Sequence, residues 1–185
     1  PYRGGCLLMS MNLPNKLTMF RVVLIPVFIV VLMSGLIAEP ASRYIAVVIF
    51  CVASFTDYLD GHIARKYNLV TNFGKFMDPL ADKLLVSAAM ICMIELGMLP
   101  AWVVIIIISR EFIITGFRLI AAESGLVIAA SWWGKIKTVT QMAMIILMLL
   151  GVNKVIGTIL VVLATIFTVV SGVDYIVKNI SVLKN

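Results

Sequence analysis

Apolar residues fill six long stretches of the chain, and short segments containing polar residues, glycine or proline separate them. A helix needs roughly 20 predominantly apolar residues to cross the hydrocarbon core of a bilayer. The pattern therefore predicts six transmembrane helices and no strands. A short amphipathic segment at 13–21 is expected at the start of the first. The predicted helices cover residues 18–37, 41–67, 77–96, 101–122, 132–150 and 155–177.

The composition supports a membrane protein. Hydrophobic residues make up 62% of the 185 residues, whereas soluble domains have about 45–50%. The sequence predicts one all-α integral membrane domain over 11–185. We expect residues 1–10 to be an added extension or a disordered N-terminus, because Met11 and the residues after it resemble a natural start. The three cysteines form no spaced pair, so neither a disulfide nor a zinc site is predicted.

The net charge of +6 indicates topology and phosphate binding, because the basic residues lie mostly in a few connections and no soluble basic face is available for nucleic acid. With six spans, the N-terminus, the second and fourth connections and the C-terminus share one side of the membrane. That side collects most of the lysines and arginines, whereas Arg43 and Lys154 lie on the other. By the positive-inside rule, the basic side faces the cytoplasm.

Four aspartates stand between segments that are apolar enough to cross a bilayer: Asp57, Asp60, Asp78 and Asp82. Carboxylates at membrane depth are costly and usually functional. Asp57 and Asp60 share one helix face, and Asp78 and Asp82 share another. Together they could bind a divalent cation such as magnesium, manganese or calcium. The alternative is that they cap helices or form salt bridges, but their mutual repulsion favours a cation.

Small and basic residues accompany these aspartates. Gly61 and Ala64 leave their helix face without bulk, so a ligand could approach closely. Arg65 could donate to a phosphate, and Lys75 stands beside Gly74 in the polar connection. The combination indicates a phosphate ester that is bound through metal.

A second group of basic residues consists of Arg110, Arg118, Lys135 and Lys137. One interpretation is a pocket for a second, anionic substrate. The other is a set of interfacial anchors that extend to lipid headgroups. Glu111 is adjacent to Arg110 in the sequence, so we expect its side chain to point elsewhere.

The aspartate segment matches the pattern D-x2-D-G-x2-A-R-x8-G-x3-D-x3-D at all eight specified positions, over residues 57–82. In this it resembles the CDP-alcohol phosphatidyltransferases. Two further segments resemble the bacterial branch of that family that makes phosphatidylglycerophosphate. They are N-x-P-N-x-x-T-x-x-R over 12–21 and W-x-G-K-x-K-T-x-x-Q over 132–141. Arg110, Glu111 and Arg118 also fit that branch.

The resemblance implies a bacterial cell-membrane enzyme with its site in a polar cavity on the cytoplasmic side. It would transfer the phosphatidyl group of CDP-diacylglycerol to sn-glycerol 3-phosphate and release CMP. It would use Mg²⁺ or Mn²⁺, with two ions, and act among membrane lipids as a homodimer without nucleic acid. Rival functions are transfer to another acceptor (cardiolipin or phosphatidylinositol phosphate synthesis), divalent-cation transport and polyprenyl-diphosphate transfer.

The resemblance also implies a role for individual residues. Asp82 would be the catalytic base. The metal ligands would be Asp57, Asp60, Asp78 and Asp82. The CDP-binding residues would be Asp57, Asp60, Gly61, Ala64, Arg65, Gly74, Asn15 and Thr18. The glycerol-phosphate-binding residues would be Arg110, Arg118, Lys135, Lys137, Arg21 and Lys75.

Overall fold

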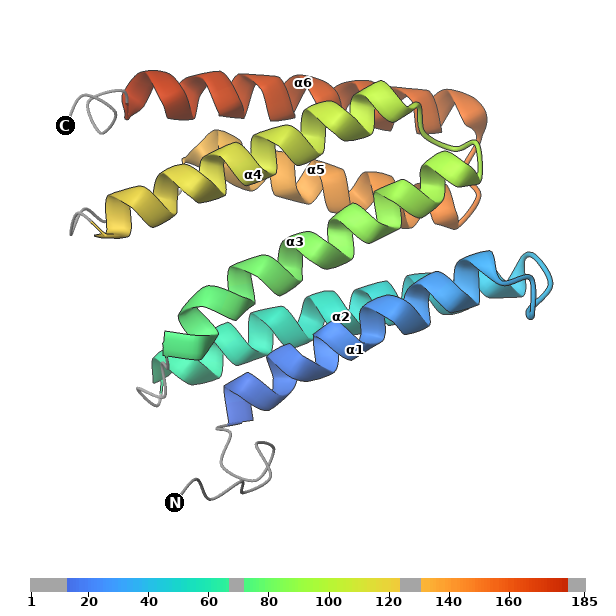
Figure 1. Cartoon of the computed structure of the whole chain (residues 1–185). Coiled ribbons are helices and arrows are strands. Elements are labelled where there is room, and N and C mark those ends of the chain that lie inside the picture. Colours follow the sequence, from blue (N-terminus) through green and yellow to red (C-terminus); the bar gives the residue numbers. More distant parts are fainter. Residues whose placement is uncertain (1–12, 67–71, 124–130, 180–185) are drawn as a thin grey trace, which may run out of the picture. The chain divides into compact units, whose positions relative to one another are not determined.

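The computed structural model describes residues 13–66, 72–123 and 131–179, which form six helices and no strand (Figure 1). This confirms the all-α prediction for the described residues. The helices are α1 (Leu13–Met33), α2 (Ala41–Lys66), α3 (Asn72–Glu95), α4 (Ala101–Glu123), α5 (Trp132–Leu149) and α6 (Lys154–Lys178). The bounds of α2, α4, α5 and α6 agree with the predicted ranges to within one residue. Residues 1–10, expected to be an extension, lie outside the described residues.

The first helix lies earlier in the chain than predicted. It begins at Leu13 and ends at Met33, so the expected amphipathic segment is the first part of α1. The prediction that the helix continues to Ile37 was wrong. The chain turns at Gly35, whose φ of +69° is a left-handed conformation that glycine adopts at little cost. Apolar composition alone could not reveal this stop, because Leu36 and Ile37 continue the hydrophobic run.

The third helix begins earlier than predicted, at Asn72 instead of Met77. Gly74 and Lys75 therefore belong to the first turns of α3 and not to a connection. The polar residues of this stretch suggested a loop, but Phe73, Met77 and Leu80 already follow the spacing of one helix face. The helical pattern extends through the polar segment.

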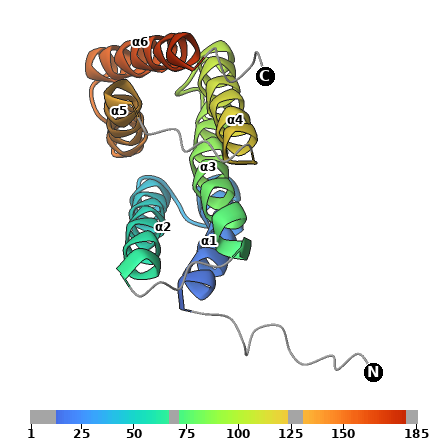
Figure 2. The same ribbon diagram turned by 90° about the vertical axis from the view of Figure 1, so that its left-hand side faces the viewer.

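The chain forms two compact units, with the boundary between Ala89 and Met90 inside α3. In the first unit, α1 and α2 lie side by side (Figures 1 and 2). One face of α1 is buried at regular helical spacing. Toward the C-terminal end of α1 this buried face is apolar, and the rings of Phe28 and Phe50 lie 6.4 Å apart between the two helices. Its first turns are polar: Asn15, Thr18 and Arg21 are buried there.

In the second unit, α6 packs against both α4 and α5. The buried face of α6 is made mainly of small residues, namely Gly157, Ala164, Thr168 and Ser171. Small residues let helices approach closely, which is how helices associate in membranes, where apolar burial gives no net driving force. The same face ends at the buried Tyr175.

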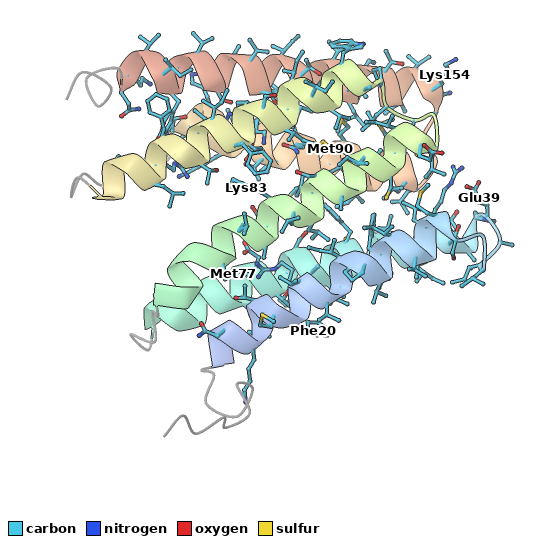
Figure 3. The ribbon with its side chains drawn as sticks, in the orientation of Figure 1. Phe20, Glu39, Met77, Lys83, Met90 and Lys154 are labelled. Carbon is cyan, nitrogen blue, oxygen red and sulfur yellow. The ribbon has the colours of Figure 1, made fainter. Side chains whose placement is uncertain are left out.

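Two helical segments are long and apolar enough to cross a membrane, Asn15–Met33 and Lys154–Lys178, among the residues described. In the most apolar 18-residue stretch of each segment, only 28% of the first and 22% of the second is buried. Figure 3 shows side chains that project from α6, and the exposed apolar residues of this helix include Val162, Ile166 and Val173. Apolar residues that face outward in this way suit lipid contact.

Candidate active site

The aspartate motif lies on two helices, as its spacing predicts. α2 remains helical to Lys66, so Asp57, Asp60 and Gly61 lie on the same face of one continuous helix. α3 carries Asp78 and Asp82 one turn apart. Five side chains of the predicted site lie outside the described residues: Asp60, Ala64, Arg65, Lys75 and Asp78. Of Gly74, only the helical backbone is described.

Asp57 is bound by an arginine from the neighbouring helix. The Nη1 of Arg21 lies 2.7 Å from the Oδ1 of Asp57. The arginine side chain is 0% exposed, whereas the aspartate side chain is 39% exposed. The Nε of Arg21 also donates to the carbonyl oxygen of Ala53, at 3.2 Å. Arg21 thus contacts two acceptors one turn apart on α2, which orients the Asp57 carboxylate.

The carbonyl of Ala53 is a shared acceptor at this point. The Thr56 hydroxyl donates to it at 2.7 Å, in addition to Arg21. Asn15 and Thr18 precede Arg21 on the same buried face of α1, 8% and 0% exposed. The polar end of the α1–α2 contact therefore lies at Asp57, the first residue of the aspartate motif.

The donor chemistry of the motif fits a hard divalent cation. Its acidic members are carboxylates, and oxygen ligands suit magnesium, manganese and calcium. Asp57 is partly exposed and held in orientation by Arg21, as expected of a metal ligand supported by an outer partner. Among the side chains that the structure describes, no three acidic, histidine or cysteine residues stand together. The convergence of all four aspartates therefore stays a prediction.

In the second unit, Glu111 contacts two of the predicted phosphate-binding residues. Its Oε1 lies 3.2 Å from the Nη1 of Arg110 and also accepts from the Nζ of Lys137. The expectation that Glu111 points away from Arg110 was wrong. Both side chains are long enough to curve toward each other although their Cα atoms are adjacent.

Lys137 is only 3% exposed, so its ammonium does not extend to lipid headgroups. Arg110 and Glu111 are also mostly buried, with 14% and 17% of their side chains exposed. Two cations thus share one carboxylate oxygen in a mostly buried cluster.

Arg118 and Lys135 are exposed, and each lies over an aromatic ring. The guanidinium of Arg118 is 5.6 Å from the centre of the Tyr175 ring. The ammonium of Lys135 is 5.2 Å from the centre of the Trp132 ring. Cation–π contacts of this kind restrict a side chain without neutralising it. The four basic residues thus form two classes, a buried ion-paired pair and an exposed stacked pair.

Comparison with known proteins places these features in a family. The family model described as CDP-alcohol phosphatidyltransferase matches residues 11–170. The chain belongs to this family. It is 46% identical to the CDP-diacylglycerol–glycerol-3-phosphate 3-phosphatidyltransferase of Bacillus subtilis over 188 aligned residues, which cover 94% of this chain and 97% of the relative.

Two further relatives carry the same name. The Haemophilus influenzae protein is 40% identical, with 91% of this chain and 93% of the relative covered. The Rickettsia bellii protein is 37% identical, with 89% and 93% covered. The similarity therefore spans nearly the whole length of this CDP-alcohol phosphatidyltransferase, including both the aspartate motif and the basic residues.

Sequence reasoning about this phosphatidyltransferase missed the partners of the site residues. Lys137 and Glu111 are 26 residues apart on different helices, and no spacing rule joins them. Tyr175 lies 57 positions after Arg118, on α6. A lysine buried in an apolar helix needs a carboxylate nearby. On that basis, Glu111 was a candidate partner of Lys137.

Proposed function

We propose that this chain transfers the phosphatidyl group of CDP-diacylglycerol to sn-glycerol 3-phosphate, giving phosphatidylglycerophosphate and CMP. The observation that carries the proposal is the complete aspartate motif on two helices, within a chain that matches glycerol-3-phosphate-specific relatives over nearly its whole length. The names of these relatives supply the donor and the acceptor.

The donor would bind at the aspartate motif. Asp57, Asp60 and Asp78 would hold a divalent ion such as Mg²⁺ or Mn²⁺, and Asp82 would lie beside a second. Bound there, the ions would neutralise the charge of the pyrophosphate and polarise the attacked phosphorus. Asn15, Thr18, Gly61, Ala64, Arg65 and Gly74 would contact the CDP group or leave room for it.

Arg21 would support this site through Asp57, whereas the sequence suggested it as a ligand of glycerol phosphate. Its guanidinium is already engaged by Asp57 and by the Ala53 carbonyl, which favours a role in orienting the metal ligand. The proposal of Arg21 as a ligand of glycerol phosphate is therefore replaced by one in which it acts through Asp57.

The acceptor's phosphate would be bound by four basic residues, namely Arg110, Arg118, Lys135 and Lys75. Arg118 and Lys135 are exposed and stacked, so they are restricted but retain their charge for an anion. A guanidinium suits a phosphate because it donates two parallel hydrogen bonds. Lys137 was also expected to bind the phosphate, but its ion pair with Glu111 favours a role in balancing that charge instead.

The reaction needs one proton transfer and one displacement. Asp82 would accept the proton of the acceptor's primary hydroxyl as its oxygen attacks the phosphorus that carries diacylglycerol. A phosphorus–oxygen bond forms to the acceptor, and the bond between that phosphorus and the CMP oxygen breaks. CMP leaves with the bonding electron pair, and the lipid product stays in the membrane.

The same proposal includes location and assembly. The chain would cross the bacterial cell membrane six times, with the site in a polar cavity at the cytoplasmic face, where soluble nucleotides and glycerol 3-phosphate are found. The distribution of lysine and arginine supports this orientation. A homodimer is proposed from the family resemblance.

A panel of acceptors tests the function. Purified protein with CDP-diacylglycerol and Mg²⁺ should release CMP with sn-glycerol 3-phosphate, and not with phosphatidylglycerol or inositol phosphate. Arg118→Ala should raise the KM for glycerol 3-phosphate by about tenfold, the loss of one charged hydrogen bond. Lys154→Ala, which removes an exposed cation from the predicted opposite face, serves as the control. Turnover with phosphatidylglycerol or inositol phosphate in place of glycerol 3-phosphate, or an unchanged KM in Arg118→Ala, would contradict the assignment.

A further inference from the structure

The cluster of Arg110, Glu111 and Lys137 joins α4 to α5 through one carboxylate oxygen. The Oε1 of Glu111 contacts both the Nη1 of Arg110 and the Nζ of Lys137. Neither cation lies at the surface: their side chains are 14% and 3% exposed. Glu111 thus determines where the charged ends of two residues from different helices lie.

Arg110 is also confined by α6. A methyl group added to Gly172 would lie 3.3 Å from the Cγ of Arg110, so the stem of the arginine passes close over this glycine. At its other end, the Nη2 of Arg110 lies 3.7 Å from where a methyl group on Gly134 would be. The absence of side chains at these two positions lets the guanidinium lie between α5 and α6.

One donor of Arg110 is left over. Among the described residues, its Nε is buried and has no hydrogen-bond partner. A buried donor without a partner costs about 1–3 kcal/mol, and more when it is charged. An anion at Nε would satisfy this donor.

We propose that Glu111 is a positioning residue of the acceptor site: it holds Arg110 through Nη1 and so presents the Nε edge to the phosphate of glycerol 3-phosphate. Lys137 compensates the charge of Glu111 and does not itself bind the phosphate. This inference rests on the proposed function, because it takes Arg110 to be an acceptor ligand. It adds an acidic residue to a site that was assigned only basic ones.

Glu111→Gln tests the inference, because glutamine keeps the shape and removes the charge. The KM for glycerol 3-phosphate should rise by about tenfold or more, the effect of weakening a charge-assisted contact. The KM for CDP-diacylglycerol should stay within about twofold, since the donor binds at the other motif. Glu39→Gln is the matched control. It breaks an exposed Glu–Arg pair with Arg43 and should change neither KM.

Two further variants separate positioning from mere charge balance. Lys137→Met should lower the melting temperature but change the KM for glycerol 3-phosphate by less than about threefold, because Glu111 still holds Arg110. The double variant Glu111→Gln with Lys137→Met removes the charges of both members of the Glu111–Lys137 pair and should recover the melting temperature. Its KM for glycerol 3-phosphate should stay as high as that of Glu111→Gln.

The outcomes are distinct. A double variant with the wild-type KM would mean that Glu111 only balances Lys137, and it would overturn the inference. So would a Lys137→Met variant as impaired as Glu111→Gln, or an unchanged KM in Glu111→Gln. If the wild-type protein itself releases no CMP with glycerol 3-phosphate, the proposed function fails and the inference falls with it. The two failures can be told apart, because failure of the proposed function is seen in the wild-type protein, whereas failure of the inference is seen only in the variants.

Discussion

Arg21 and Asp57 form an ion pair between α1 and α2, with 2.7 Å between the Nη1 of the arginine and the Oδ1 of the aspartate. The arginine is fully buried and the carboxylate is partly exposed. The pair connects the N-terminal segment of the family resemblance to the aspartate motif. It gives a physical reason why those two sequence segments lie together.

Replacing Arg21 with methionine should loosen this connection. Arg21→Met removes the buried guanidinium that contacts the Asp57 carboxylate and should destabilise the protein by about 2 kcal/mol. The Mg²⁺ concentration for half-maximal activity should rise by about 10-fold to 100-fold, as for loss of other outer partners of metal ligands. Thermal unfolding in detergent and a Mg²⁺ titration measure the two effects.

Arg43→Met is the matched control for this variant. It also removes an arginine from an ion pair, here with Glu39, but that pair is exposed on α2 and its preceding turn. Exposed pairs contribute less than about 1 kcal/mol. If both variants change the melting temperature and the Mg²⁺ requirement equally, Arg21 has no special connection to the metal site.

Asp57→Asn should affect metal and donor together. The amide keeps the size of the carboxylate and one oxygen, but it has no charge for a divalent ion. The Mg²⁺ requirement should therefore rise, and the affinity for CDP-diacylglycerol should fall in parallel. Measuring the donor KM at several Mg²⁺ concentrations checks this. A Mg²⁺ titration curve that overlays that of the wild type would exclude a ligand role.

Asp82→Asn should remove turnover and retain binding. General bases contribute about 100-fold to 10,000-fold to rate, and asparagine cannot accept the proton. CMP release should fall by that factor, while binding of CDP-diacylglycerol stays largely intact. Single-turnover CMP release and an equilibrium binding assay together test it. Near-normal turnover would show that another group takes the proton.

Gly172→Ala should disturb the acceptor site through the aliphatic part of the Arg110 side chain. The new methyl group would lie 3.3 Å from the Cγ of Arg110, so the arginine must shift by a few tenths of an ångström. Small displacements of a binding group have measurable costs, and we expect the KM for glycerol 3-phosphate to rise by about threefold. The donor KM should not change.

Gly116→Ala provides the comparison for that variant. Gly116 lies inside α4, and an added methyl group would meet nothing within 4 Å. Alanine favours a helix over glycine, so this variant should keep full activity and the wild-type melting temperature or a higher one. Equal losses in both variants would point to a general effect of the substitution.

The sequence was sufficient to predict the helices whose ends have strong local signals. α4 begins after Pro100 and α2 begins after Pro40, and both starts were predicted to the residue. The end of α1 was not predicted, because only Ser34 and the left-handed Gly35 interrupt an otherwise apolar run. The start of α3 was missed because polar residues in the first turns of a helix resemble those of a loop.

The candidate site was predictable as a set of residues and less so as a set of contacts. The spacing of Asp57, Asp60 and Gly61 gives one face of a helix, and α2 confirms that arrangement. The Arg21–Asp57 pair and the Lys137–Glu111 pair join residues 36 and 26 positions apart. Such contacts depend on how helices pack, and neither periodicity nor composition specifies them.

The most direct test of the central claim is CMP release by the purified protein from CDP-diacylglycerol. The account predicts release that requires both Mg²⁺ and sn-glycerol 3-phosphate, stops on addition of EDTA and resumes when excess Mg²⁺ is restored. Release that continues in EDTA, or that does not depend on glycerol 3-phosphate, would contradict it.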